Sequence, residues 1–418
     1  MGDKDPRLNE RLNRFYDHIE GEMPPASLEH FDSDAAGRRA RVVHLWAGVA
    51  GVAAVAAAIG GLAFGLASHR TGPLPAPATS HSPSAPAASS SPNPSSSPSA
   101  SAFANFQPVA FSAISESQYW VLGNSGNDQP VLLHTLDGGQ TFQQIPSPPA
   151  ALFQANGTQS VMGIRFADAS DGYVYGSALW ATHDGGAHWH QVTIGGSVPQ
   201  LEPGAGGFVY AIVRHCPAAG GSCASTVERS IASGDAWSTL ALPSHSSGTS
   251  EAIGVHGTSL WVMQFGTGKL YVSRDAGASF SAETFPCVPE LDGSIDPVSD
   301  SVIWAFCPTG MQGGVAVSSD GGHTWMSHQG GFSNGGIVAG LSATNAFVSD
   351  ASSALRVTHN GGASFSTILN WQPTSGFWVG FTDASVGYAV VAGPNASGMQ
   401  LWRTTDGGTH WAQVTFAG

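Results

Sequence analysis

The sequence predicts an all-β fold, a seven-bladed β-propeller of four-stranded blades, and three observations lead to this prediction. A short motif recurs along residues 103–418, and its copies lie 40 to 48 residues apart. The stretches between copies are short apolar or alternating runs, each bounded by glycine, aspartate or serine. A repeat period in this range is typical of propellers, in which one repeat forms one blade.

The repeated motif is an apolar strand, then Asp-Gly-Gly or a close variant, two small or polar residues, and an aromatic residue. Its first polar position is occupied by Asp137, Asp184, Asp275, Asp320, Asn360 and Asp406. Its aromatic position is occupied by Phe142, Trp189, Trp237, Phe280, Trp325, Phe365 and Trp411. In the copy that ends at Trp237, Ala232 replaces the aspartate.

The chemistry of the motif is that of a turn. An aspartate side chain accepts hydrogen bonds from backbone N–H groups of its own turn, and glycine supplies left-handed dihedral angles. The aromatic residue is expected to pack between neighbouring blades. Asn360 keeps the acceptor and Ala232 loses it, so the third blade should have the weakest turn. We therefore expect these aspartates to be structural, because identical positions dispersed around a ring cannot converge as catalytic carboxylates.

The second repeat shows the pattern of one blade most clearly. Its expected strands are 163–167, 173–176, 179–183 and 189–192, with turns at 168–172 and 184–188. The first and last repeats also contain four strands each, so the sequence shows no evident exchange of a strand between the chain ends and does not decide how the ring closes. Residues 101–107 are left as a possible further edge strand.

The residues before the repeats divide into three segments. Residues 1–43 are charged and contain one short amphipathic helix, with leucine, phenylalanine and isoleucine at helical spacing. Residues 44–67 contain no Asp, Glu, Lys or Arg over 24 positions, enough to cross a bilayer as a helix. Residues 68–102 hold 8 proline and 12 serine residues, a composition typical of a disordered linker.

The charges around residues 44–67 predict the orientation. Arg38, Arg39 and Arg41 precede this segment and only Arg70 follows it closely, so the N-terminus should remain in the cytoplasm. A cleaved signal peptide is the alternative, and the long acidic leader favours an uncleaved anchor. We therefore expect a single-pass membrane protein whose residues 103–418 lie outside the cytoplasm.

The charge of the repeat region excludes one class of partner. The chain has a formal net charge of −14, and only seven basic residues follow position 102. Nucleic-acid binding needs clustered lysine and arginine, which this region lacks.

Two repeats carry a second stretch, Phe-x-Asp-x-x-x-Gly-Tyr, before the motif. These pairs are 166–176 with 182–189, and 381–391 with 404–411. They resemble the Asp-box (BNR-type) repeats, most closely those of photosystem II stability/assembly-factor-like propellers, over nearly all of residues 103–418. The resemblance implies a seven-bladed, non-enzymatic scaffold that assembles or stabilises a membrane complex. The cytoplasmic leader, membrane anchor and stalk are departures from that family.

Enzyme interpretations were weighed against the same residues. A sialidase would need an arginine cluster and a tyrosine nucleophile with a glutamate partner, and only Arg165 lies in an expected innermost strand. Another glycoside hydrolase would need two facing carboxylates, for which Asp168, Asp296 and Asp383 are candidates without a reason to pair. We predict no catalytic residue and no cofactor.

Two polar clusters were weighed as metal sites. His183, His188 and His190 surround one motif, and an acidic loop spans residues 290–300. Motif turns are exposed in propellers, so we expect surface histidines and a solvated loop, and no metal site.

Four cysteines fall in the repeat region, which indicates two disulfides in an exported domain. Three pairings are possible. Cys216 and Cys223 flank one loop, and Cys287 and Cys307 lie in loops of the same face, so we predict Cys216–Cys223 and Cys287–Cys307.

The face opposite the motif turns carries the longest loops and is the expected binding face. Its candidate residues are Phe153, Arg165, Trp371, Phe377 and Trp378. The sequence thus predicts a membrane-anchored propeller that binds a protein partner outside the cytoplasm, and a membrane complex is one such partner. A cell-surface glycoside hydrolase and a sensor coupled to residues 1–43 are the alternatives.

Overall fold

The structure is a computed structural model that describes residues 103–418 with internal gaps. The gaps are residues 104, 127–128, 154–158, 218–221, 245–249, 334, 351–353, 371–377 and 394–397. The predicted segments 1–43, 44–67 and 68–102 lie outside the described residues, as do Trp371 and Phe377. Within the described part of the chain, no helix is long and apolar enough to span a membrane.

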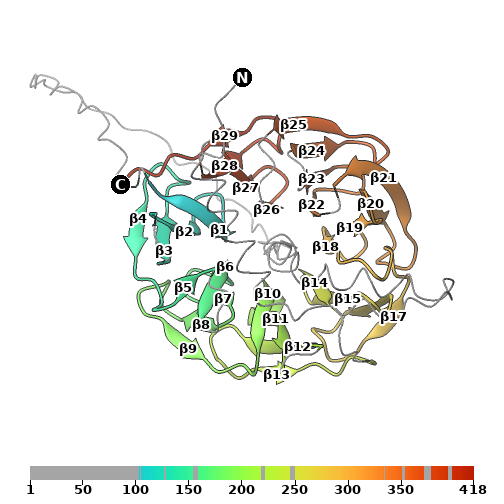
Figure 1. Ribbon diagram of the computed structural model, residues 1–418, viewed down its shortest axis with the longest axis horizontal. Helices are drawn as coiled ribbons and strands as arrows, with labels where there is room; N and C mark the ends of the chain where they lie inside the picture. Colours follow the sequence, from blue (N-terminus) through green and yellow to red (C-terminus); the bar gives the residue numbers. More distant parts are fainter. Residues whose placement is uncertain are drawn as a thin grey trace, which may run out of the picture. The chain divides into compact units, whose positions relative to one another are not determined.

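Seven antiparallel sheets stand side by side around a central axis (Figure 1). Blade one contains β1 (Gln107–Ala113), β2 (Tyr119–Asn124), β3 (Val131–Thr135) and β4 (Gln143–Ile145). Blade two contains β5 (Ala151–Leu152), β6 (Ser160–Phe166), β7 (Gly172–Gly176), β8 (Leu179–Thr182) and β9 (His190–Val192). Blade three contains β10 (Ser197–Pro203), the 3-10 turn η1 (Ala205–Gly207), β11 (Phe208–His215), β12 (Ala224–Ile231) and β13 (Ser238–Thr239).

The other four blades follow in chain order. Blade four contains β14 (Glu251–His256), β15 (Ser259–Gln264), β16 (Lys269–Ser273) and β17 (Ser281–Glu283). Blade five contains β18 (Ser294–Pro297), β19 (Ile303–Pro308), β20 (Gly313–Ser318) and β21 (Met326–Phe332). Blade six contains β22 (Gly336–Gly340), β23 (Ala346–Asp350), β24 (Ala354–Thr358) and β25 (Ser366–Asn370). Blade seven contains β26 (Trp378–Phe381), β27 (Gly387–Ala392), β28 (Met399–Thr404) and β29 (Ala412–Gln413).

The predicted all-β, seven-bladed propeller of four-stranded blades is confirmed, with one addition. Each blade is a meander of consecutive strands, and the first long strand of each blade lies nearest the axis (Figure 1). In blade two a short extra strand, β5, pairs in parallel with β6, so that this sheet has five strands. Strand β5 comes from the linker between blades one and two and is not among the four strands that the sequence predicts for this blade.

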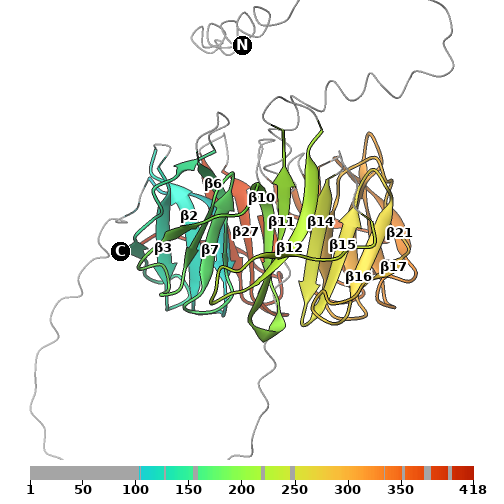
Figure 2. The same ribbon diagram turned by 90° about the horizontal axis from the view of Figure 1, so that it is seen from below.

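The strands cross the propeller from one face to the other (Figure 2). One face carries the turns between the first and second, and the third and fourth, long strands of each blade; we call it the turn face. The other carries the loops between the second and third strands and the linkers between blades; we call it the loop face. In six blades the second long strand is buried along almost its whole length, because it lies between the neighbouring blades. These strands are β2, β7, β15, β19, β23 and β27.

Aromatic rings fill the spaces between blades. Trp120 of blade one stacks on Phe166 of blade two, with ring centroids 3.7 Å apart. The indole N–H of Trp120 also reaches the backbone oxygen of Gly185 in that blade, at 3.3 Å. Motif aromatics contact the preceding blade in the same way: Trp237 packs on Tyr173, and Phe365 on Phe332. The core is therefore a set of inter-blade layers rather than one central cluster.

The ring closes without exchange of a strand between the chain ends, a point that the sequence leaves open. Blade one and blade seven each consist of consecutive strands, and the C-terminal residues then pack against blade one. The N–H of Phe142 donates to the backbone oxygen of Ala417 at 2.7 Å, and the ring of Phe416 lies 4.7 Å from that of Phe106. Side chains and tail contacts, rather than a shared sheet, therefore hold the first and last blades together.

Candidate functional site

The motif aspartates are engaged in their own turns. Oδ1 of Asp320 accepts the N–H of Thr324 at 2.9 Å and the hydroxyl of Ser318 at 2.8 Å. Oδ2 accepts the hydroxyl of Thr324 at 2.5 Å. These hydrogen bonds, led by the Thr324 hydroxyl, favour the ionised carboxylate and lower the pKa of Asp320 to about 2. Asp137, Asp184, Asp275 and Asp406 make the same type of turn, and each has its pKa lowered to about 2.

Asn360 provides the acceptor in blade six, where its Oδ1 receives the N–H of Ser364 at 2.9 Å. Blade three has only the methyl group of Ala232 at this position. There the hydroxyl of Ser230 donates to the backbone oxygen of Gly234 instead.

A second turn element was present in the sequence and escaped notice. Two residues before the polar position, every copy carries a hydroxyl: Thr135, Thr182, Ser230, Ser273, Ser318, Thr358 and Thr404. In the six copies with Asp or Asn, this oxygen accepts backbone N–H groups of the turn, such as that of Gly322 at 2.9 Å from Ser318. Because these hydrogen bonds engage the aspartate side chains within their own turns, the aspartates act as structural groups of the turns.

The centre of the propeller carries a layer of buried polar side chains. Ser112, Arg165, Glu202 and Asp296 are each the penultimate residue of an innermost strand, in β1, β6, β10 and β18. Nε of Arg165 lies 3.3 Å from Oε2 of Glu202. These positions lie near the turn-face ends of their strands, because each strand ends at a turn of that face.

Two members of this layer tie neighbouring blades together. The hydroxyl of Ser112 accepts the N–H of Phe166 at 2.8 Å, which joins blade one to blade two. Oδ2 of Asp296 accepts the N–H of Gly340 at 2.6 Å, which joins blade five to blade six. In both cases the acceptor binds the last residue of the neighbouring innermost strand.

Burial raises the pKa values of the two carboxyl groups in this central layer. It raises the pKa of Glu202 to about 7, and the adjacent guanidinium of Arg165 opposes the rise. Burial raises the pKa of Asp296 to about 8, against the lowering effect of the Gly340 N–H. These pKa values are in the range that a general acid needs. Both carboxyl groups are buried, however, so neither is exposed to a substrate in solution.

The structure brings together two of the five predicted binding residues. The guanidinium carbon of Arg165 lies 5.9 Å from the ring centre of Trp378, and both side chains are buried. Phe153 is exposed and has a positive φ of 56° in the linker before β6. Arg165 and Trp378 therefore belong to the packed centre, whereas Phe153 lies on the loop face.

The three carboxylates considered for hydrolysis have separate roles. Oδ1 of Asp168 accepts the N–H groups of Ser170 and Asp171 at 2.7 and 2.8 Å. Asp383 holds the equivalent turn of blade seven through Ser385 and Val386. Asp296 lies in the central layer, so the three do not form an acid and base pair.

The loop face carries both disulfides and several exposed apolar side chains. Cys216 is joined to Cys223 and Cys287 to Cys307, the predicted pairing. Val288 follows one half of the second bridge and is exposed. Met311, in the loop after Cys307, is 94% exposed.

Known proteins resemble this chain in fold only. No protein-family model and no curated protein matches it. The solved structure of YCF48 bound to a D1 peptide matches with a TM-score of 0.50 and 16% identity, covering 68% of this chain and 90% of that one. YCF48 from Cyanidioschyzon merolae matches at 0.46 and 13%, covering 72% and 94%. A GH74 enzyme of Niastella koreensis matches at 0.35 and 15%, covering 73% and 54%. The chain shares the fold of the YCF48 structure with the bound D1 peptide.

Proposed function

We propose that the protein is a non-enzymatic scaffold whose propeller binds a protein partner outside the cytoplasm, anchored in the membrane by residues 44–67. The observation that carries this proposal is the loop face, where Met311, Val288 and Phe153 are exposed on loops of a rigid ring. Exposed apolar side chains on fixed loops are typical of protein interaction sites, and methionine is enriched in such interfaces. The seven turns would then be Asp-box repeats that build the scaffold.

Two further observations support the location and the kind of ligand. Disulfides persist in exported proteins and are rare in the cytosol, and both bridges of this chain lie in the propeller. A propeller of this fold, YCF48, is solved with a peptide bound. A peptide or protein segment is therefore the ligand class we assign to the loop face.

A glycoside hydrolase is the second candidate, and one observation favours it. Glu202 and Asp296 share a layer and have raised pKa values, as the general acid of such enzymes requires. Their burial and the inter-blade hydrogen bond of Asp296 favour a structural role. Glycan release by the purified chain that disappears in Glu202→Gln would support the enzyme instead.

A membrane-impermeant cross-linker applied to intact cells, followed by recovery of the full-length chain, tests the scaffold. We expect a defined protein to be recovered with the native chain and lost with Met311→Asp combined with Val288→Asp. Met326→Asp is the matched control, because Met326 is 61% exposed on β21, the outermost strand of the same blade.

Three outcomes would contradict the proposal. Equal recovery with the loop-face variant and the control would remove the loop face as the binding site. Absence of any cross-link from outside the cell would contradict the extracytoplasmic location. Glycan release without a protein partner would replace the scaffold with the hydrolase.

A further inference from the structure

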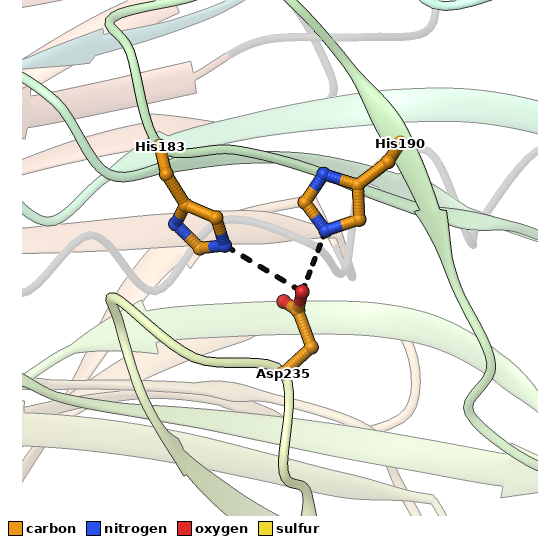
Figure 3. Close-up of side chains that lie close together, drawn as sticks. All are labelled: His183, His190 and Asp235. Atoms are coloured by element: carbon orange, nitrogen blue, oxygen red, sulfur yellow. Dashed lines mark hydrogen bonds and ion pairs between the residues drawn. The ribbon is translucent and has the colours of Figure 1, made fainter.

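Three polar side chains meet on the turn face at the seam between blades two and three. His183 lies in the motif turn of blade two, and His190 begins β9 of the same blade. Asp235 lies in the turn between β12 and β13 of blade three. Both imidazole rings point at the carboxylate of Asp235 (Figure 3).

The distances place three donor atoms around one small volume. Nε2 of His190 lies 2.6 Å from Oδ2 of Asp235, and Nε2 of His183 lies 3.5 Å from the same oxygen. One donor atom from each residue lies within 4.8 Å of the others. Around a tetrahedral zinc ion with bonds of about 2.0–2.1 Å, donor atoms are roughly 3.3 Å apart. The separations at the seam, from 2.6 Å to at most 4.8 Å, therefore bracket that spacing.

His183 is held in the orientation that a metal ligand needs. Its Nδ1 lies 2.7 Å from Oδ1 of Asp171, which is buried between β6 and β7. An ionised carboxylate only accepts hydrogen bonds, so Nδ1 carries a proton, and Nε2 is the nitrogen left to offer its lone pair when a metal ion binds. A carboxylate behind a ligating histidine is the usual second partner in zinc sites.

The arrangement differs from that of two other motif histidines, His188 and His410. His188 and His410 each lie 2.6 Å from the aspartate of their own turn, Asp184 and Asp406, and are largely exposed. No comparable group of three donors is found elsewhere among the described residues. The donors at the seam come from two blades and remain partly exposed, with side-chain exposures of 33% for His183, 49% for His190 and 29% for Asp235.

We propose that His183, His190 and Asp235 form a binding site for one divalent transition-metal ion that links blades two and three, with Asp171 orienting His183. Two imidazoles and one carboxylate suit zinc, copper, nickel and cobalt, and the ligand set leaves a position for water. The ion would lie between the two imidazole Nε2 atoms and a carboxylate oxygen of Asp235. Without a metal ion, protons on the nitrogens hold these atoms together through hydrogen bonds. It would also reinforce the seam at the blade whose turn lacks the motif aspartate.

The experiment is titration of the full-length chain, purified without a polyhistidine tag, with Zn²⁺ alone. We expect one tight site per chain. His190→Ala or Asp235→Asn should weaken it at least about 100-fold, more than the roughly 10- to 100-fold cost of losing an orienting partner. Asp171→Asn should weaken it by that smaller factor. His188→Ala and His410→Ala are the matched controls and should bind zinc as the native chain does.

Near-ultraviolet circular dichroism of the metal-free variants shows whether each has folded. Electron paramagnetic resonance with Cu²⁺ provides a readout of the ligands themselves: two imidazole nitrogens in the native chain and one in His190→Ala. The site would be ruled out if the native chain has no tight zinc binding, or if His190→Ala changes neither affinity nor the nitrogen couplings. Unchanged affinity in Asp171→Asn would rule out its orienting role.

Discussion

Replacing Arg403 by alanine should weaken the closure of the ring. Arg403 extends from β28 of blade seven, and its Nη1 donates to the backbone oxygen of Gly138 at 3.0 Å. Its Nη2 donates to the backbone oxygen of Glu116 at 2.8 Å. Both acceptors belong to blade one. The guanidinium also lies over Tyr388, 5.9 Å from the ring centre.

The size of the effect follows from these contacts. A hydrogen bond to a charged group contributes about 1.5–3 kcal/mol, and the bond to Glu116 is exposed to solvent, so we place it below that range. Together the two bonds should contribute about 2–4 kcal/mol.

Arg274 provides an internal comparison. Its Nη1 and Nη2 donate to the backbone oxygens of Asp300 and Gly321 of blade five, both at 3.0 Å. The local loss in Arg274→Ala should therefore be similar. Blades four and five are joined by a chain linker, however, whereas blades seven and one are not. Opening the terminal seam releases more conformational freedom, so Arg403→Ala should have the additional effect of local opening.

Urea unfolding and hydrogen exchange of the native chain and both variants would measure this. We expect Arg403→Ala to lower the free energy of unfolding and to speed exchange in β1 and in the C-terminal residues. Arg274→Ala should leave exchange at that seam unchanged. Equal exchange at the terminal seam in the two variants would refute the closing role of Arg403.

Two further predictions concern buried positions. Asp296→Asn should flatten the pH dependence of stability: burial raises the pKa of Asp296 from 3.8 to about 8, so its stabilising contribution is full below about pH 4 and is lost as the pH rises towards 8. Urea unfolding should show the native chain losing up to about 1.4 kcal/mol per pH unit across this window relative to the variant, and parallel curves would contradict it. Gly408→Ala should cost about 3 kcal/mol or more, because φ is +86° and the new Cβ would lie 2.1 Å from Phe347. Gly207→Ala, with φ of +74° and no atom within 4 Å, should cost only about 1 kcal/mol, and equal shifts in thermal unfolding would show that the Phe347 contact is unimportant.

The propeller contains two chemically different sets of carboxylates. Those of the turns are exposed and accept several hydrogen bonds, so their pKa values are lowered. Glu202 and Asp296 in the centre are buried, so their pKa values are raised. Acidic residues that look alike in the sequence thus have opposite effects on the pH dependence of stability, and only their surroundings distinguish them.

Much of the fold was predictable because it depends on short-range patterns. The number of motif copies indicated the number of blades, and glycine with aspartate marked the turns. The cysteine pairing followed once the loops had been assigned to one face. The strand β5 was missed because Ala151–Leu152 is too short to show a period. The binding residues were harder to place: Arg165 and Trp378 stand in innermost strands, and the sequence does not show whether such residues line an opening or fill the centre.

By itself, the sequence determined the propeller, its seven turns and the aspartate or asparagine acceptor of six of them, because these involve residues only a few positions apart. The tertiary structure alone decided which side chains meet across the blades. Arg403 contacts Glu116 across 287 positions, and His190 meets Asp235 across 45. Such contacts depend on how rigid blades pack against one another, and no local pattern records that packing. The motif therefore defines the scaffold, and the packing of the blades decides which distant side chains meet at the seams.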